Sequence, residues 1–112
     1  ASGIVVSNHG GPVLDHCPAT AEVLPEIVDA VGGKMTIFVD GAIRSGMDMF
    51  KALALGADAV LIGRPFVTTV YGGGEEGVQL YVQKLKAELA DTMRMCGAHS
   101  LAEIKRSMLF GF

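Results

Sequence analysis

The chain has 112 residues, of which 50% are hydrophobic and 19% are charged, and its formal net charge is −3. This length fits one domain, and the mixed charges without a basic cluster argue against nucleic acid as a partner. No apolar run reaches the roughly 18 residues of a membrane span. Cys17 and Cys96 lack metal-binding spacing. With no basic leader visible either, we expect reduced thiols in a cytoplasmic protein without a membrane partner.

The first predicted elements are a strand and a helix. Residues 3–7 (GIVVS) form a short β-branched run, which is typical of a strand covered on both faces. Residues 18–33 predict a helix with Thr20 as a possible N-cap and a glycine pair at its end. Pro25 lies inside this helix, where it would either kink the helix or mark a second start.

The same alternation continues along the chain. Residues 34–41 (KMTIFVDG) predict a second strand, and Ser45 is placed to cap a helix over residues 46–56. Residues 58–65 (DAVLIGRP) predict a third strand. A weak repeat relates ASGIVVS at the start of the chain to ADAVLIG. Strands that alternate with helices indicate βα units and parallel pairing.

The remaining third of the chain is predicted to be helical. A short helical piece near residues 65–73 precedes a long helix from about residue 75 to residue 96. A last short helix is expected over residues 100–109, where Ser100 and Glu103 have capping-box spacing. Side chains on one face of the long helix recur at helical spacing, which indicates packing: Val78, Tyr81, Val82, Leu85, Leu89, Met93 and Cys96.

Three βα units are compatible with two architectures. They can form a small open three-stranded α/β sheet, or the last part of a (β/α)8 barrel, which has eight units and typically about 250 residues. We favour the partial barrel, because the sequence opens directly on a strand. Functional residues of such barrels lie at the carboxyl ends of the strands.

Polar residues and glycines follow each predicted strand. Ser7 and His9 follow the first strand, residues 40–44 (DGAIR) follow the second, and Gly63 and Arg64 follow the third. Glycine lets a phosphate approach backbone N–H groups, and the guanidinium of arginine offers it a planar fork of donors. Two such strand ends in consecutive units therefore predict an anion site. At such a site the carboxylate of Asp40 can accept hydrogen bonds from ligand hydroxyls.

Each of these residues also has a simpler explanation. Asp40 can belong to an ordinary turn, and Arg64 can be a surface charge. His9 is as compatible with a structural role as with a catalytic one. His16 and Cys17 follow it in the same loop, but no fourth ligand is evident, so we expect no metal site.

Several segments resemble the C-terminal part of the FMN-dependent α-hydroxy acid oxidases and dehydrogenases, a family that includes glycolate oxidase, L-lactate oxidase and mandelate dehydrogenase. The segments are SNHGG, DGAIRSG, KALALGADAVLIGRP, YGGGEEGV and MCGAHSLAEI. The third is shared more widely, for instance by type 2 isopentenyl diphosphate isomerase, whereas SNHGG together with GRP narrows the match. The resemblance implies a (β/α)8 barrel of which residues 1–112 hold strands six to eight.

The resemblance also implies roles for individual residues. Ser7 would contact the flavin, and His9 would be the base that takes a proton from a small 2-hydroxy acid. Whether the hydroxyl proton or the α-proton leaves first stays open, and a neutral imidazole suits either step. The ribityl phosphate of FMN would be held at the other two strand ends by Asp40, Gly41, Ala42, Ile43, Arg44, Gly63 and Arg64.

Two positions depart from the family pattern. Pro12 stands where the family usually has an arginine that pairs with the substrate carboxylate, and proline offers neither a charge nor an N–H. Ala42 stands where a second glycine is usual. The flavin-contacting lysine, the other substrate-binding groups and the acid that orients the histidine have no counterpart in this chain.

The sequence therefore predicts a fragment of an FMN-dependent oxidoreductase that oxidises a small 2-hydroxy acid. We expect the isolated chain to be inactive, and either to self-associate or to need the missing N-terminal part of its barrel, because open strand edges invite pairing. Two alternatives remain. One is a non-catalytic, phosphate-binding half-barrel module, and the other is a different FMN- or phosphate-binding barrel enzyme such as the isomerase.

Overall fold

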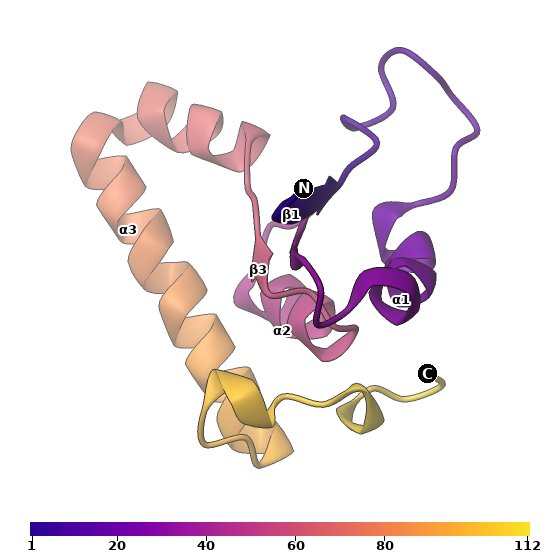
Figure 1. Ribbon diagram of the computed structural model, residues 1–112. Helices are drawn as coiled ribbons and strands as arrows, with labels where there is room; N and C mark the ends of the chain where they lie inside the picture. Colours follow the sequence, from indigo (N-terminus) through magenta and orange to yellow (C-terminus); the bar gives the residue numbers. More distant parts are fainter.

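The computed structural model describes residues 1–112 and contains a parallel sheet of three strands in the order β1-β2-β3. Figure 1 shows the strands β1 (Gly3–Val6), β2 (Thr36–Val39) and β3 (Ala59–Val60), connected by the helices α1 (Thr20–Val31) and α2 (Gly46–Ala54). This arrangement confirms the α/β class and the parallel βα units. β3 is shorter than the predicted strand, because its partner strand β2 ends at Val39.

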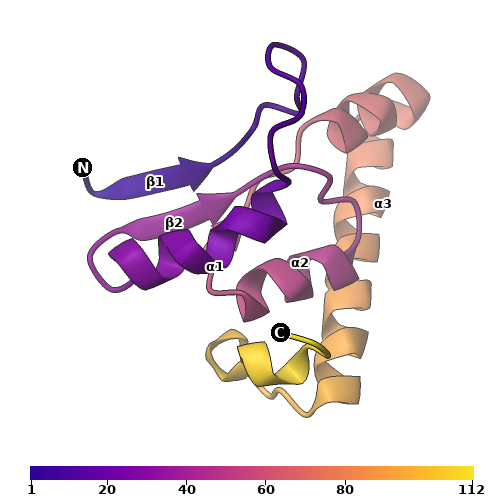
Figure 2. The ribbon, with the colours of Figure 1, turned by 90° about the vertical axis from the view of Figure 1, so that its right-hand side faces the viewer.

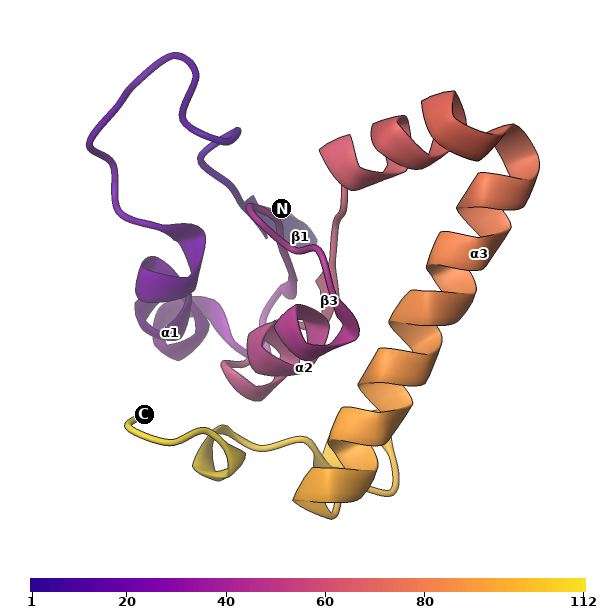
Figure 3. The same ribbon diagram turned by 180° about the vertical axis from the view of Figure 1, so that it is seen from behind.

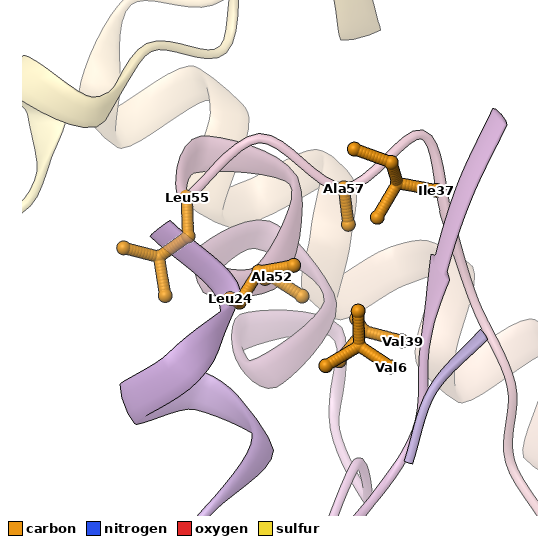
Figure 4. Close-up of a cluster of buried hydrophobic side chains, with 7 residues drawn as sticks. All are labelled: Val6, Leu24, Ile37, Val39, Ala52, Leu55 and Ala57. Atoms are coloured by element: carbon orange, nitrogen blue, oxygen red, sulfur yellow. The ribbon is translucent and has the colours of Figure 1, made fainter. Parts of the chain in front are cut away.

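Both α1 and α2 pack on the same face of the sheet. Figure 4 shows the buried cluster between these helices and the sheet. It consists of Val6, Leu24, Ile37, Val39, Ala52, Leu55 and Ala57. Side chains alternate along a strand, so Val5 points to the opposite face, where it is 49% exposed. The prediction of strands covered on both faces is therefore wrong for this chain, whose sheet has one covered face.

The start of α1 differs from the prediction. Ala19, and not Thr20, is the N-cap residue, and its N–H donates a hydrogen bond of 2.6 Å to Oε2 of Glu22. The buried hydroxyl of Thr20 instead donates to the carbonyl oxygen of Asp40 at 2.6 Å, which fixes the start of α1 against the end of β2. Pro25 lies within the helix without ending it.

The third helix, α3 (Arg64–Cys96), consists of two straight parts that meet at Gly74. This glycine has φ 55° and ψ −139°, and Figure 3 shows the bend between the short part and the long part. The two parts confirm the predicted short piece and long helix. The long part packs against α2 through Leu85, which is buried, whereas Val82 is 47% exposed. The packed stripe is therefore narrower than the predicted one.

The end of the chain forms two turns of 3-10 helix in place of the single predicted helix. They are η1 (Leu101–Glu103) and η2 (Arg106–Met108). Ser100 makes no side-chain cap, so the predicted capping box does not form. Between the two turns Ile104 is buried against Phe50, Ala54 and Ala98, and this contact interrupts helix formation. No helix of the structure combines the length and the apolar character that a membrane span requires.

Candidate active site at the strand ends

Figure 2 shows that the loop after β1 and the start of α3 lie near the ends of the strands. A cavity of about 280 Å³ is formed there by residues of these segments and of the segment after β2. It brings together all of the predicted site residues except Ser7, namely His9, Asp40, Gly41, Ala42, Ile43, Arg44, Gly63 and Arg64. Gly10, Leu61, Ile62 and Pro65 also line it, although they were not among the predicted site residues. Each of these four is next to a predicted residue or strand end, and that adjacency is the signal that could have identified them.

The loop after β1 is held by its own polar side chains. Oγ of Ser7 accepts a hydrogen bond of 3.0 Å from the N–H of His9, and Oδ1 of Asn8 accepts one of 2.9 Å from the N–H of Gly10. His9 has φ 54°, in the left-handed region that non-glycine residues rarely adopt. Ser7 thus fixes the backbone of His9 from outside the cavity wall.

The same loop reaches the start of α3. A Cβ atom added at Gly10 would lie 3.1 Å from Cζ of Arg64 and closer still to one of its guanidinium nitrogens. Gly10 also has φ 74°, which favours glycine. The absence of a side chain at this position therefore leaves room for the guanidinium of Arg64 beside the histidine loop.

Asp40 presents an unsatisfied acceptor to the cavity that it lines. Its Oδ1 atom is buried and has no hydrogen-bond partner in the chain. Its backbone is fixed, because the N–H donates to the carbonyl oxygen of Val6 at 3.2 Å and the carbonyl accepts the hydrogen bond from Thr20. A buried acceptor without a partner is costly, so a ligand hydroxyl or N–H that donates to this atom would be stabilised.

Unpaired backbone donors also line the cavity. The N–H groups of Gly41, Ala42, Ile43, Gly63 and Arg64 make no hydrogen bond within the chain. Gly41 has φ 96° and Ala42 has φ 58°. These angles place the segment in a tight turn, and successive amides of turns can form concave nests that bind anions. Together with the two arginine side chains, these donors give the cavity the groups that an anion would need.

Most of the N–H groups at the start of α2 are occupied by acceptors of the chain itself. Asp48 accepts hydrogen bonds of 3.1 Å from the N–H groups of Arg44 and Ser45, and its own N–H donates to Oγ of Ser45. The cap predicted at Ser45 is therefore confirmed. Oε2 of Glu88, on α3, accepts a hydrogen bond of 2.7 Å from the N–H of Gly46. The expectation that a helix N-terminus adds positive charge to the anion site consequently applies to α3 and not to α2.

Two residues of α3 that support the site were missed in the sequence. The hydroxyl of Tyr81 donates a hydrogen bond of 2.7 Å to the carbonyl oxygen of Arg44. Glu88 pairs with Lys84 as well as with the N–H of Gly46, and these two hydrogen bonds lower the pKa of its carboxyl group. Helical spacing indicated only that Tyr81 belongs to the packed face.

Other candidate chemistry does not assemble here. His16 and Cys17 are exposed on the loop before α1, and no three histidine, cysteine, aspartate or glutamate side chains gather as a set of metal ligands. Pro12 is exposed in the same loop and does not line the cavity.

Comparison with known proteins identifies what this arrangement resembles. L-lactate oxidase of Roseobacter sp. (strain GAI101) is 49% identical over 112 residues, which is 100% of this chain and 30% of that protein. Glycolate oxidase of Spinacia oleracea is 50% identical over 107 residues, covering 96% of this chain and 29% of its own. The crystal structure of mandelate oxidase with benzoyl-formic acid superposes with a TM-score of 0.91 at 47% identity, covering 95% of this chain and 32% of that one.

This chain thus spans about a third of the length of the relatives that it matches. The sequence profile of the FMN-dependent dehydrogenases matches residues 1–110, nearly the whole chain. The profile, the sequence identities and the superposition agree with the resemblance carried by the strand-end motifs. The chain therefore belongs to the FMN-dependent dehydrogenase family.

Proposed function

We propose that the protein containing this chain is an FMN-dependent oxidoreductase that converts small 2-hydroxy acids into 2-oxo acids. One observation carries the proposal: a single cavity joins unpaired N–H groups, two arginines and an unpaired buried acceptor. The relatives named L-lactate oxidase and glycolate oxidase favour this function over a non-catalytic module and over an isomerase.

The residues present fit FMN. The guanidinium groups of Arg44 and Arg64 and the free N–H groups beside them suit its phosphate, which carries negative charge. Oδ1 of Asp40 suits a hydroxyl of the ribityl chain, because that atom is buried and lacks a donor. A structure of a mandelate oxidase variant with an FMN adduct superposes on this chain with a TM-score of 0.91.

His9 is the group that we assign to proton transfer. It lines the cavity, and its N–H is held by Ser7. Its imidazole would take a proton from the 2-hydroxy acid, as a general base does. Bound FMN would supply the two-electron acceptor for the oxidation. Ser7 was predicted to contact the flavin, and we propose that it also acts indirectly, by fixing the backbone of this histidine.

We further propose that residues 1–112 form three of the eight βα units of a barrel, corresponding to strands six to eight. The uncovered sheet face and the free edges of β1 and β3 support this, since both would be satisfied by further strands. The isolated chain would then self-associate and show no turnover. Sedimentation at micromolar concentration and an assay with added FMN test this, and a well-folded monomer would count against it.

The function is tested on the full-length protein. We expect a yellow protein whose visible absorption is that of bound FMN, and anaerobic addition of lactate or glycolate should bleach it. His9→Gln should retain FMN and lose the bleaching, because the general base is absent. A colourless preparation that takes up no FMN on titration would exclude the proposal. Full activity in the His9→Gln variant would exclude the role of the histidine.

A further inference from the structure

Tyr81 contacts both of the segments that supply the arginines. Its hydroxyl donates a hydrogen bond of 2.7 Å to the carbonyl oxygen of Arg44, in the segment after β2. Its ring packs edge to face against Phe66, with ring centroids 5.1 Å apart and an angle of 72° between the planes. Phe66 lies in the first turn of α3, two residues after Arg64. One side chain therefore spans the two strand ends.

The helices α2 and α3 are in close contact at the start of α2. Gly46 lies so close to α3 that an added Cβ would be 2.6 Å from the carbonyl oxygen of Leu85. Its N–H is bound by Glu88. The start of α2 is thereby fixed on α3, and the hydroxyl of Tyr81 is placed to set the position of the preceding residue, Arg44, within that frame.

The side chains of the two arginines are not held by ion pairs. Neither Arg44 nor Arg64 takes part in an ion pair within the chain, and both are exposed. The backbone N–H of Arg44 binds only Asp48, in its own helical cap. A phosphate that contacts both cations needs their backbones at a set separation, and holding that separation before binding lowers the entropy cost of binding.

We propose that Tyr81 is a positioning residue that holds the Arg44 and Arg64 segments at the separation required by one phosphate group. This inference rests on the proposed function, because it concerns the same FMN site. Partial burial raises the pKa of the Tyr81 hydroxyl above its ordinary value, so the hydroxyl keeps its proton and donates throughout the neutral range.

The effect of Tyr81 should depend on the phosphate. A residue that only stabilises the fold would affect every ligand of the cavity equally. A residue that sets the arginine separation would affect FMN and leave riboflavin, which lacks the phosphate, unchanged. The ratio of the two dissociation constants therefore separates a positioning role from a structural one.

The test compares Tyr81→Phe with Tyr71→Phe in the full-length protein, with FMN and riboflavin titrated separately by flavin fluorescence. Tyr71 is the other tyrosine of the chain, and it is 89% exposed on the same helix. We expect Tyr81→Phe to bind FMN about 2- to 10-fold more weakly, the effect of losing one hydrogen bond, with riboflavin binding unchanged. Tyr71→Phe should match the parent for both ligands.

A second variant, Phe66→Leu, removes the ring contact and keeps the hydroxyl. It should also weaken FMN binding without affecting riboflavin. Unchanged FMN affinity in Tyr81→Phe, or an equal loss for both flavins, would overturn the positioning role. A parent protein that binds neither flavin would instead refute the proposed function, and this inference with it.

Discussion

The helices α2 and α3 each follow a strand of the same parallel sheet after a short loop, but their first turns differ. At α2, side-chain oxygens of Ser45, Asp48 and Glu88 accept hydrogen bonds from the first N–H groups. At α3 the N-cap is Gly63, which has no side chain, and the N–H groups of Gly63 and Arg64 have no partner in the chain.

This difference shows that the location of a helix start is not enough to predict an anion site. Every helix presents partial positive charge at its N-terminus, and carboxylates of the same chain compete for it with any ligand. At α2 the carboxylates of Asp48 and Glu88 occupy that position. The start of α3 is open, and the arginine that begins it adds a full positive charge.

Closing the open helix start should have the largest effect. Gly63→Asp would place a carboxylate at the N-cap of α3, where an added Cβ meets no atom within 4 Å and φ is −106°. We expect FMN affinity in the full-length protein to fall about 100-fold or more, because juxtaposed like charges cost several kcal/mol. Fluorescence titration measures the affinity.

The matched control is Gly63→Asn, which has the same shape as the aspartate without its charge and should lose much less affinity. Because both variants place a side chain of the same shape on the same backbone, their thermal stabilities should be similar, which separates the effect of charge from that of folding. If Gly63→Asp bound FMN as tightly as the parent, the phosphate would lie away from α3.

Removing the guanidinium of Arg64 from the start of α3 should have the next largest effect on FMN affinity. Arg64→Ala is expected to weaken FMN binding by about 1.5 to 3 kcal/mol, the range for a hydrogen bond to a charged group. Arg94→Ala is the control, because Arg94 is exposed, pairs with Asp91 and lies near the other end of α3 from Arg64. Equal FMN affinities for these two variants in the same titration would contradict the assignment of Arg64.

The loop after β1 differs from the segments after β2 and β3, because residues 7–19 contain no lysine or arginine. With Pro12 in that loop, we expect poor use of 2-hydroxy acids. Pro12→Arg should raise kcat/KM for lactate or glycolate about 10- to 150-fold by supplying a cation for the carboxylate. Leu14→Arg, an exposed position in the same loop, should not. If Pro12→Arg improves no 2-hydroxy acid, another residue holds the carboxylate.

Replacing Glu88, the carboxylate that binds the start of α2, should have the smallest effect of these changes. Lys84 and the N–H of Gly46 lower the pKa of Glu88. The folded state therefore favours the carboxylate, and this stabilisation is present above the unfolded pKa of about 4.3 and is lost as pH falls through the folded pKa. Glu88→Gln should cost less than about 1 kcal/mol at neutral pH, because the group is partly exposed.

Thermal unfolding at several pH values measures this cost. Glu88→Gln and the parent should converge in acid, once the parent carboxylate is protonated. The exposed Glu76 makes no hydrogen bond or ion pair in the chain, so Glu76→Gln should leave the profile unchanged. A gap between Glu88→Gln and the parent that persisted in acid would show that the loss is not electrostatic.

The parts predicted from sequence are those encoded within one βα unit. Alternating strand and helix signals, and the polar residues that follow each strand, lie within short stretches of chain. Parallel pairing then brings the strand ends to one edge, so Asp40, Arg44 and Arg64 could be predicted to share a site. The cap at Ser45 was predictable for the same reason, since its partner Asp48 is three residues away.

The parts that could not be predicted depend on distant partners. Tyr81 and Glu88 bind backbone groups 37 and 42 residues away. Helical periodicity shows that such side chains share a face, but not which group each one meets. The same limit explains Thr20, whose hydroxyl binds a carbonyl 20 residues away in place of capping its own helix. Burial of Ile104 likewise overrode the helical signal near the end of the chain.

The bend of α3 at Gly74 determines which chirality of amino acid can occupy that position. Its angles, φ 55° and ψ −139°, are the mirror image of an extended conformation that L-residues adopt readily. No atom lies within 4 Å of an added Cβ, so stereochemistry and not space restricts this position. A chain carrying D-alanine here would keep the corner, whereas L-alanine would favour one uninterrupted helix and draw Phe66 away from Tyr81.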